Sequence, residues 1–278
     1  MLVTSKELYK EARKNNYAIP ATNFVDQTSI KAYIEVAEKL NLPIILAYAE
    51  AHEDLLSFDE ALCLGKYYGK RAKVPVVLHL DHGTTKELII RAINEGFKSV
   101  MIDASMDCFE DNVKKTREIV DYAHLRGVVV EAEIGHVGNG EGYKSNDDSD
   151  SIYTTVEEAK KIVELTNVDS LAISIGTAHG AYKGKPVIDF NRLKEIRNAI
   201  DTPLVLHGGS STGDDNLGRC ATEGISKINI YTDLVTAAFN KAQRIKANDY
   251  YELRNSLMEG MKECLEHYYR VFQTKIFG

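Results

Sequence analysis

Short apolar runs rich in β-branched residues alternate along the chain with longer amphipathic stretches. The apolar runs predict eight strands, at residues 17–23, 43–49, 74–81, 98–104, 128–134, 169–175, 203–209 and 226–231. Most of them are apolar almost throughout, which is typical of parallel strands covered on both faces. The stretches between them show the period of amphipathic helices, and several end in Gly or Asn, as helices commonly do.

Roughly eight strand-then-helix units in 278 residues predict an α/β fold, namely a single TIM (β/α)₈ barrel domain over residues 1–278. A doubly wound open sheet is the alternative, but no GxGxxG pattern follows the first predicted strand, so dinucleotide binding has no support. Residues 135–153 form a polar, Gly-rich stretch of the length typical of a lid or of a disordered loop. Residues 232–278 exceed what the last barrel unit needs and predict extra C-terminal helices, which could pack on another subunit.

The charge balance narrows the choice of partners. Lys and Arg number 34 against 41 Asp and Glu, a net charge of -7, so we expect no nucleic-acid partner. No apolar run approaches the ~18–20 residues that span a bilayer, so we expect no membrane association. The N-terminal stretch lacks the apolar segment of a signal peptide, and the four cysteines are widely spaced without a CxxC pair. These features favour a cytoplasmic protein with reduced, mostly buried thiols.

Polar and ionisable residues cluster where the predicted strands end. The C-terminal ends of barrel strands meet on one face, which is where barrel active sites lie. Three neutral imidazoles with an open fourth position are the make-up of a catalytic Zn²⁺ site. Carboxylates beside such a site orient the imidazoles and move protons. The histidines at strand ends are His82, His179 and His207, and the carboxylates are Asp81, Asp103 and Glu133.

A phosphate site is predicted from the sequences HGGSS (207–211) and NIYT (229–232). A Gly-Gly-Ser turn after a strand presents backbone N–H groups and a hydroxyl, and barrels bind phosphate in the loops after strands seven and eight. Lys183, in the preceding loop, could approach the same place and is a candidate for substrate binding. A metal held by three histidines beside a phosphate site suits proton abstraction next to the carbonyl of a phosphorylated sugar.

Six segments resemble, in their order and spacing, the class II, zinc-dependent ketose-bisphosphate aldolases, which include the fructose-1,6-bisphosphate and tagatose-1,6-bisphosphate enzymes. They are HLDHG (79–83), SVMIDAS (99–105), VEAEIGHVGNGEG (130–142), GTAHGAYKG (176–184), PLVLHGGSS (203–211) and KINIYT (227–232). The resemblance covers essentially the whole chain. It implies a lyase of carbohydrate metabolism, such as glycolysis, that cleaves a ketose bisphosphate reversibly into dihydroxyacetone phosphate and an aldehyde such as glyceraldehyde 3-phosphate.

The resemblance also implies how the metal is held. In such enzymes the histidines that match His82, His179 and His207 bind the catalytic zinc ion. Asp103 and Glu133 match positions that can hold the zinc ion in an alternative, buried location. A monovalent cation, Na⁺ or K⁺, often helps to organise the phosphate site of these enzymes.

Proton transfer and substrate binding are implied in the same way. Asp81 matches the residue that exchanges a proton with the C4 oxygen, and Glu141 the one that moves the proton at the carbon of the dihydroxyacetone phosphate enediolate. Arg254 resembles the arginine that reaches a neighbouring subunit to bind the second phosphate, which implies a homodimer or homotetramer. The other implied substrate contacts are Asn23, Gly180, Gly208, Gly209, Ser210, Asn229, Ile230, Tyr231 and Thr232.

Three residues depart from the pattern of fructose-bisphosphate enzymes. Ala49 stands where they usually carry Ser or Thr, Leu253 where they carry Pro, and Tyr231 where a smaller residue is common. All three affect the aldehyde end or the wall of the site, so another ketose 1-phosphate is an alternative substrate. Glu50 and His52, which follow Ala49, are candidates for contacting an unusual aldehyde.

Two other functions stay open. A metal-dependent sugar-phosphate isomerase or epimerase would use the same groups, and a metal-binding scaffold subunit would keep the fold without turnover. A Schiff-base aldolase needs a lysine at a strand end inside the barrel. Lys227 lies near the start of the eighth predicted strand, so we expect it to be structural. His79 shares a face with Asp81, and we expect it to support the site by hydrogen bonding or to fill the barrel.

Overall fold

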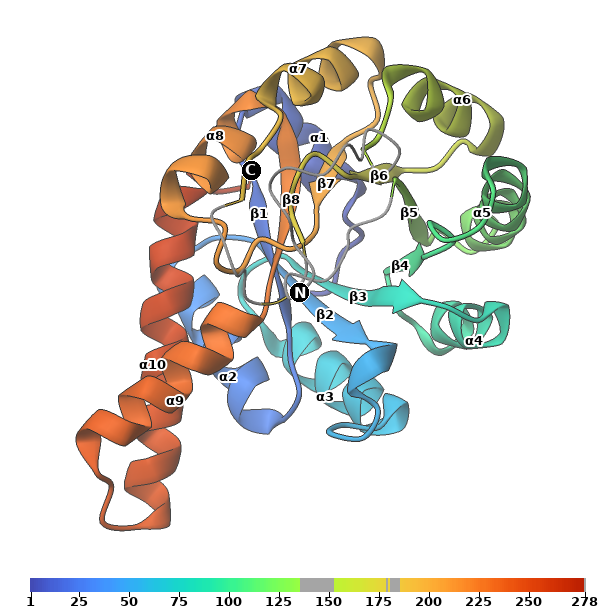
Figure 1. The fold of residues 1–278 in the computed structure, drawn as a ribbon. Coiled ribbons are helices and arrows are strands. Elements are labelled where there is room, and N and C mark those ends of the chain that lie inside the picture. The colour runs from blue at the N-terminus through green and yellow to red at the C-terminus, as the bar shows by residue number, and fades with distance from the viewer. Residues whose placement is uncertain (136–152, 179, 181–185, 278) are drawn as a thin grey trace.

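Eight parallel strands close into a barrel in which each strand pairs with its neighbours in sequence and the first pairs with the last (Figure 1). The computed structural model describes residues 1–135, 153–178, 180 and 186–277. The predicted TIM (β/α)₈ barrel is confirmed, and each strand overlaps its predicted range. The strands are β1 (Ile19–Asn23), β2 (Ile44–Ala49), β3 (Val76–Gly83), β4 (Ser99–Ile102), β5 (Val129–Ile134), β6 (Ser170–Ile173), β7 (Leu204–Leu206) and β8 (Ile225–Ile230).

Helices surround the barrel and cover the outer face of its strands (Figure 1). Outward-pointing side chains such as Leu46, Leu78 and Val130 are fully buried beneath them, in the larger of two apolar clusters. The helices are α1 (Lys6–Asn15), α2 (Gln27–Leu40), α3 (Phe58–Arg71), α4 (Lys86–Glu95), α5 (Phe109–His124), α6 (Val156–Thr166), α7 (Phe190–Ala199), α8 (Asp214–Glu223), α9 (Thr232–Ile245) and α10 (Tyr250–Val271), and a 3₁₀ turn, η1, spans Glu50–His52.

The smaller apolar cluster lies inside the barrel. It joins Leu8 and Tyr9 of α1 to Ile19, Ile45 and Val77, which alternate along their strands with the outward-pointing residues. Because side chains of a strand point alternately to its two faces, this second set points inward. Helix α1 therefore closes one end of the barrel, and the polar residues at the strand ends gather at the other.

A β-bulge interrupts β3 where its polar residues lie. The pairing with β4 shifts by one residue between Leu80 and Gly83, and His82 adopts a positive φ of 50°. A regular strand would send the side chains of Asp81 and His82 to opposite faces. The bulge, with His82 in the left-handed region, brings both to the same site. Such strain in a residue other than glycine is typical of functional positions.

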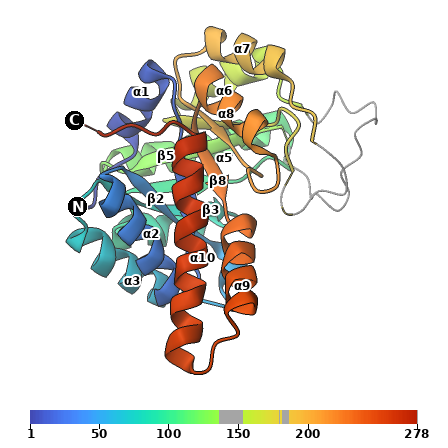
Figure 2. The same ribbon diagram turned by 90° about the vertical axis from the view of Figure 1, so that its left-hand side faces the viewer.

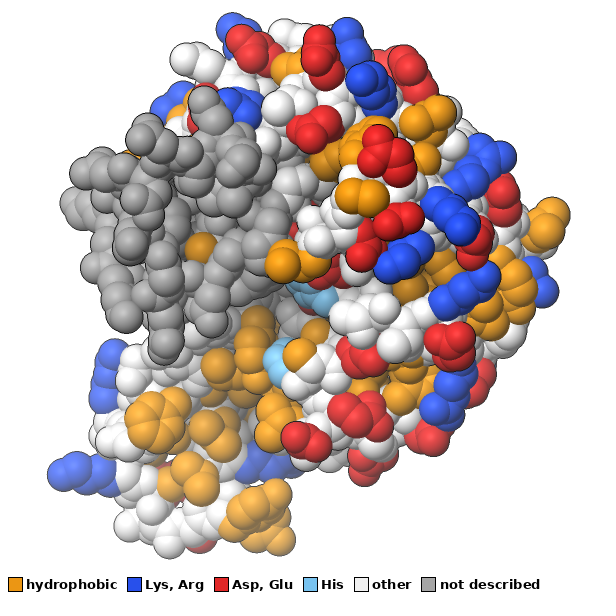
Figure 3. Space-filling model, turned by 45° about the vertical axis from the view of Figure 1, so that its right-hand side comes forward, with side chains coloured by type: hydrophobic (Ala, Val, Ile, Leu, Met, Phe, Trp, Pro, Cys, Tyr) orange, Lys and Arg blue, Asp and Glu red, His pale blue; other side chains and the backbone are white. Residues whose placement is uncertain are grey.

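Helices α9 and α10 form an arm that extends beyond the barrel. They pack side by side and antiparallel, as Figure 2 shows. The arm exposes a set of large apolar side chains, and Figure 3 shows apolar side chains gathered on the lower part of one face. These exposed residues of the arm are Phe239, Ile245, Tyr250, Tyr251 and Leu253. The two predicted C-terminal helices are therefore present, with an apolar surface left uncovered in the single chain.

Two further expectations concern the cysteines and the membrane-spanning character of the helices. All four cysteines are free, but the expectation of mostly buried thiols is wrong, because Cys63 and Cys108 are exposed and Cys220 alone is fully buried. Cys63 lies on the solvent side of α3, and Cys108 precedes the first turn of α5. Among the described residues, no helix combines the length and apolar character that a membrane crossing requires.

Candidate active site

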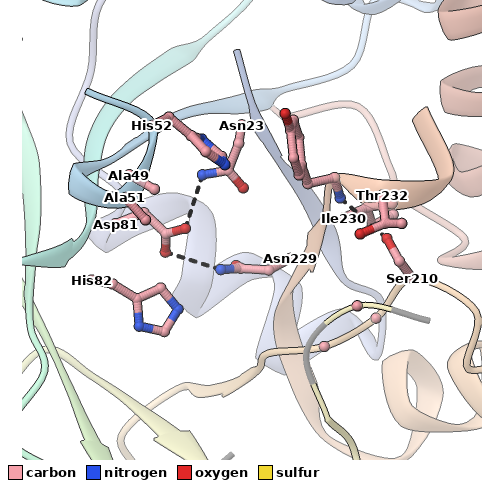
Figure 4. A pocket seen from close by; sticks show the side chains of 14 residues that line it. Asn23, Ala49, Ala51, His52, Asp81, His82, Ser210, Asn229, Ile230 and Thr232 are labelled. Carbon is pink, nitrogen blue, oxygen red and sulfur yellow. Dashed lines mark hydrogen bonds between the residues drawn. The ribbon is translucent and has the colours of Figure 1, made fainter. Parts of the chain in front are cut away.

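A pocket at the C-terminal ends of the strands collects residues from β1, β3 and β8 and from the turns after β2 and β7. Histidine side chains are visible in a hollow on this side of the molecule (Figure 3), and Figure 4 shows the pocket itself. The expected residues Asn23, Asp81, His82, Gly180, Gly208, Gly209, Ser210, Asn229, Ile230, Tyr231 and Thr232 all line it, together with Ala49, Ala51 and His52.

Asp81 is held at the centre of the pocket by two amides. Asn23 donates from Nδ2 to one carboxylate oxygen over 3.0 Å, and Asn229 donates to the other over 3.0 Å (Figure 4). Burial alone would raise the pKa of Asp81, but the imidazole of His82 and the ammonium of Lys227 outweigh it and hold this pKa well below its usual range. Asp81 is therefore a carboxylate in a fixed orientation, able to accept a proton.

His82 and His207 face each other across the site. His82 Nδ1 lies 3.0 Å from Asp103 Oδ2, and His207 Nε2 lies 3.0 Å from Glu131 Oε1. If each of these nitrogens donates to its carboxylate, the other nitrogen of each ring is an acceptor. These two acceptors, His82 Nε2 and His207 Nδ1, are 2.9 Å apart. Two lone pairs at this distance repel each other unless a proton or a metal ion lies between them.

The surrounding carboxylates make the space between His82 and His207 favourable for positive charge. Burial disfavours the charged form of His82, but Asp81, Asp103 and Glu133 outweigh it and raise the pKa of His82 to about 9. Glu133 Oε2 also lies 3.6 Å from His207 Nδ1. A site that stabilises a proton on imidazole in this way also stabilises a cation bound to imidazole.

The donor set therefore fits a Zn²⁺ ion. Two overlapping groups bring their ligand atoms within 4.8 Å of one another, namely Asp81 with His82 and His207, and His82 with Asp103 and Glu133. Imidazole nitrogen and carboxylate oxygen are the usual zinc ligands outside thiolate sites. The second group coincides with the residues expected to hold zinc in an alternative buried position.

A layer of buried charge lies beneath the two histidines. Glu131, Lys227 and His79 are each 0% exposed, and Lys227 donates to both carboxylate oxygens of Glu131 over 2.8 Å. His79 contacts Lys227 and, on its other nitrogen, Ser99 Oγ, as expected of a supporting residue. Glu131 was not among the residues predicted from the sequence. Its signal was the two-residue spacing from Glu133 within one strand, which places both carboxylates on the inner face of β5.

The opposite end of the pocket is the start of α9. The hydroxyl of Ser210 accepts hydrogen bonds from the backbone N–H group of Tyr231 (Figure 4) and from that of Asp233. Its own proton remains available to donate. A helix N-terminus with oriented N–H groups beside a Gly-Gly-Ser turn favours an anion such as phosphate.

Ala49, Ala51, His52 and Tyr231 form the wall of the pocket beyond Asp81. The ring centroids of His52 and Tyr231 lie 4.6 Å apart, and burial lowers the pKa of His52, which favours a neutral imidazole. Glu50, the other candidate for the aldehyde end, instead accepts hydrogen bonds from the backbone N–H and hydroxyl of Thr84.

Several expected residues do not join this pocket. Glu141, His179 and Lys183 lie outside the described residues, as does most of the predicted lid at 135–153. Arg254 lies on α10, where its Nε is 3.4 Å from Thr28 Oγ1, and does not line the pocket of its own chain.

Comparisons with known proteins agree on one family. A family model described as fructose-bisphosphate aldolase class-II matches residues 3–275. The crystal structure of the YdjI aldolase from Escherichia coli K12 is similar with a TM-score of 0.89 and 32% sequence identity, over 99% of this chain and 98% of that chain. The fructose-bisphosphate aldolase of Campylobacter jejuni has a similar fold, with a TM-score of 0.85 and 24% identity over 100% and 97% of the two chains.

The glycine after His207 offers a test of how tightly the site is built. Gly208 and Gly127 have similar positive φ angles, 69° and 66°, but a Cβ on Gly208 would lie 2.3 Å from Ala178 O, whereas a Cβ on Gly127 meets nothing within 4 Å. We expect Gly127→Ala to cost about 1–2 kcal/mol, the price of the left-handed backbone. Gly208→Ala should cost about 1–3 kcal/mol more, because the backbone must move. Urea unfolding measures both, and equal losses would contradict the crowding at Gly208.

Proposed function

Because the chain belongs to the class-II fructose-bisphosphate aldolase family, we propose that this aldolase carries out a zinc-dependent, reversible retro-aldol cleavage. The proposed substrate is fructose-1,6-bisphosphate or tagatose-1,6-bisphosphate, either of which would yield dihydroxyacetone phosphate and glyceraldehyde 3-phosphate. The observation that carries the proposal is the convergence of Asp81, His82 and His207 beside the N-terminus of α9. This arrangement supports a base, a metal site and a phosphate site close to one another, since Asp81, His82 and Thr232 line one pocket and His207 lies beside Asp81 and His82.

His82 and His207 would hold the zinc ion, with His179 as the third ligand. When bound, Zn²⁺ acts as a Lewis acid on the ketone oxygen and stabilises the negative charge that develops there. Asp81 accepts the proton of the C4 hydroxyl as the C3–C4 bond breaks, and returns it in the condensation direction. Asn23 and Asn229 orient Asp81 for this transfer, since they hold both of its oxygens.

The dihydroxyacetone phosphate half would bind toward α9. Ser210 would offer its hydroxyl to the phosphate, and Gly208 and Gly209 would line the phosphate position. Lys183 and a monovalent cation, Na⁺ or K⁺, would be further partners. Glu141 would return a proton to the carbon left by the departing aldehyde, because the resemblance assigns that role to the matching glutamate.

We also propose a homodimer or homotetramer in which a second copy of the chain covers the arm. Tyr250 and Tyr251 are 71% and 75% exposed there, and apolar surface of this kind marks an interface. Arg254 would then serve the site of the neighbouring chain, since it does not reach its own. A cytoplasmic location is proposed with it, because all four cysteines are unpaired.

Metal removal tests the reaction class. We expect a chelator to abolish release of triose phosphate from fructose-1,6-bisphosphate or tagatose-1,6-bisphosphate in a coupled assay, and added Zn²⁺ to restore it. Borohydride should not trap the enzyme on its substrate, because Lys227 Nζ is engaged with Glu131 and His79. Full activity of the metal-free protein would contradict the proposal, and isomerised sugar without cleavage would indicate an isomerase or epimerase.

The role of Asp81 can be separated from metal binding. We expect Asp81→Asn to lower kcat by about 10²–10⁴-fold, the usual contribution of a general base, while one zinc ion per chain is retained. Zinc content by elemental analysis and kcat from the coupled assay are measured on the same preparation. Loss of the zinc ion from Asp81→Asn would make Asp81 a ligand instead, and an unchanged kcat would remove it from the reaction.

The aldehyde half is tested in the condensation direction. We expect glyceraldehyde 3-phosphate to be preferred over glyceraldehyde, and Arg254→Ala to lower its kcat/KM by about 10-fold or more, because a charge-assisted contact to phosphate is lost. Arg244, an exposed arginine on the same arm, provides the matched control. Arg244→Ala should leave the rates with glyceraldehyde 3-phosphate and with glyceraldehyde unchanged. A preference for unphosphorylated aldehydes would favour another ketose 1-phosphate as the substrate, the alternative suggested by Ala49 and Leu253.

A further inference from the structure

The buried charges beneath the pocket form one connected network. Glu131 comes from β5, Lys227 from β8 and His79 from β3, and each side chain is 0% exposed inside the barrel. Lys227 Nζ contacts both oxygens of Glu131 over 2.8 Å and His79 Nε2 over 3.1 Å. Glu131 Oε1 in turn contacts His207 Nε2 over 3.0 Å. The network therefore ends on one of the two histidines that face the metal position.

The contacts of the network define where the protons lie. Lys227 can only donate, so His79 Nε2 accepts and His79 Nδ1 donates to Ser99 Oγ, 2.8 Å away. A carboxylate with its two oxygens bound by Lys227 can only accept, so His207 Nε2 donates to Glu131. The lone pair of His207 Nδ1 then points away from the network, toward His82.

Stability alone does not explain the network. Replacing a buried ion pair with apolar side chains of similar volume is often neutral or stabilising, because two charges no longer have to be desolvated. A barrel interior filled by branched apolar residues would be the ordinary solution. The one feature that such a core would lack is an acceptor for His207 Nε2.

We propose that Glu131, held in place by Lys227, is the positioning residue that makes Nδ1 the metal-binding atom of His207. Lys227 has two effects in this arrangement. It fixes the carboxylate of Glu131 below His207, and it occupies both carboxylate oxygens so that Glu131 does not become a competing ligand. The inference rests on the proposed zinc-dependent function.

Two double variants test the role of Glu131. Glu131→Leu with Lys227→Met leaves an apolar core and no acceptor for His207, and we expect the affinity for Zn²⁺ to fall about 10–100-fold. Glu131→Gln with Lys227→Met is equally neutral, but the amide oxygen accepts from His207 and the amide N–H₂ faces His79, whose Nε2 is 4.0 Å from the replaced oxygen. This variant should recover most of the lost affinity.

Zinc affinity is measured by competition with a chromophoric chelator, and the visible spectrum of the Co²⁺-substituted proteins reports the ligand geometry. The Leu/Met variant should shift the cobalt bands, and the Gln/Met variant should restore them. Thr166→Val is the control, since Thr166 is fully buried on α6 and its hydroxyl makes local contacts, donating to Ile162 O and accepting from the backbone N–H of Val168. Thr166→Val should change neither the affinity for Zn²⁺ nor the visible spectrum of the Co²⁺-substituted protein. An unchanged affinity and spectrum in the Leu/Met variant, or an equal loss in both double variants, would overturn the proposal.

A measurement on the unaltered protein avoids any question of folding. The ¹⁵N shifts of the histidine rings in the zinc-loaded enzyme should show His207 protonated at Nε2 and bound through Nδ1. Protonation at Nδ1 would overturn the proposal. The result is independent of substrate turnover, so a protein that binds zinc in this way but cleaves no ketose phosphate would contradict the proposed function and leave the role of Glu131 intact.

Discussion

The closure of eight parallel strands into one barrel is the constraint on which the rest of the structure depends. A closed parallel barrel brings every strand's C-terminal end to the same rim, so residues as far apart in sequence as Asn23, Asp81 and Asn229 become hydrogen-bonding neighbours. The same closure creates an interior that must be filled. Helix α1 and its partners fill one end with apolar side chains, and charged side chains fill the other.

The chemistry at the rim requires two local departures from regular structure. His82 occupies a left-handed backbone conformation inside a β-bulge, and Gly208 turns so closely past Ala178 that a methyl group does not fit. The left-handed conformation of His82 is destabilising when taken alone, whereas Gly208 adopts its positive φ without strain because it has no Cβ. The effect of the two departures is to place the imidazoles of His82 and His207 opposite each other, with lone pairs directed to one point. A bound cation would remove the repulsion between the two ring nitrogens, which lie 2.9 Å apart.

The buried charges also combine an energetic cost with a role in orienting the site. Asp81, Glu131 and Lys227 are all at least 97% buried, by their exposures of 3%, 0% and 0%, and each alone would be costly in the interior. Together they are mutually compensated, and the same contacts that offset the cost also orient the groups that face the substrate. The arm of α9 and α10 shows the reverse case, in which large apolar side chains are exposed in the single chain and Arg254 does not line the pocket of its own chain.

The barrel and most of the rim were predictable from the sequence, because apolar strands, helical periods and polar strand ends are local patterns that do not require knowledge of tertiary contacts. Asp81, His82 and His207 were also predicted, since each directly follows or ends an apolar run. Glu131 was not predicted, because the function of a carboxylate in the middle of a strand depends on its contacts with Lys227 and His207, which are distant in sequence. The bulge at His82, the pairing of both asparagines with Asp81 and the exposed thiol of Cys63 were likewise decided by the tertiary structure. Such features depend on which strands and helices become neighbours in the folded chain.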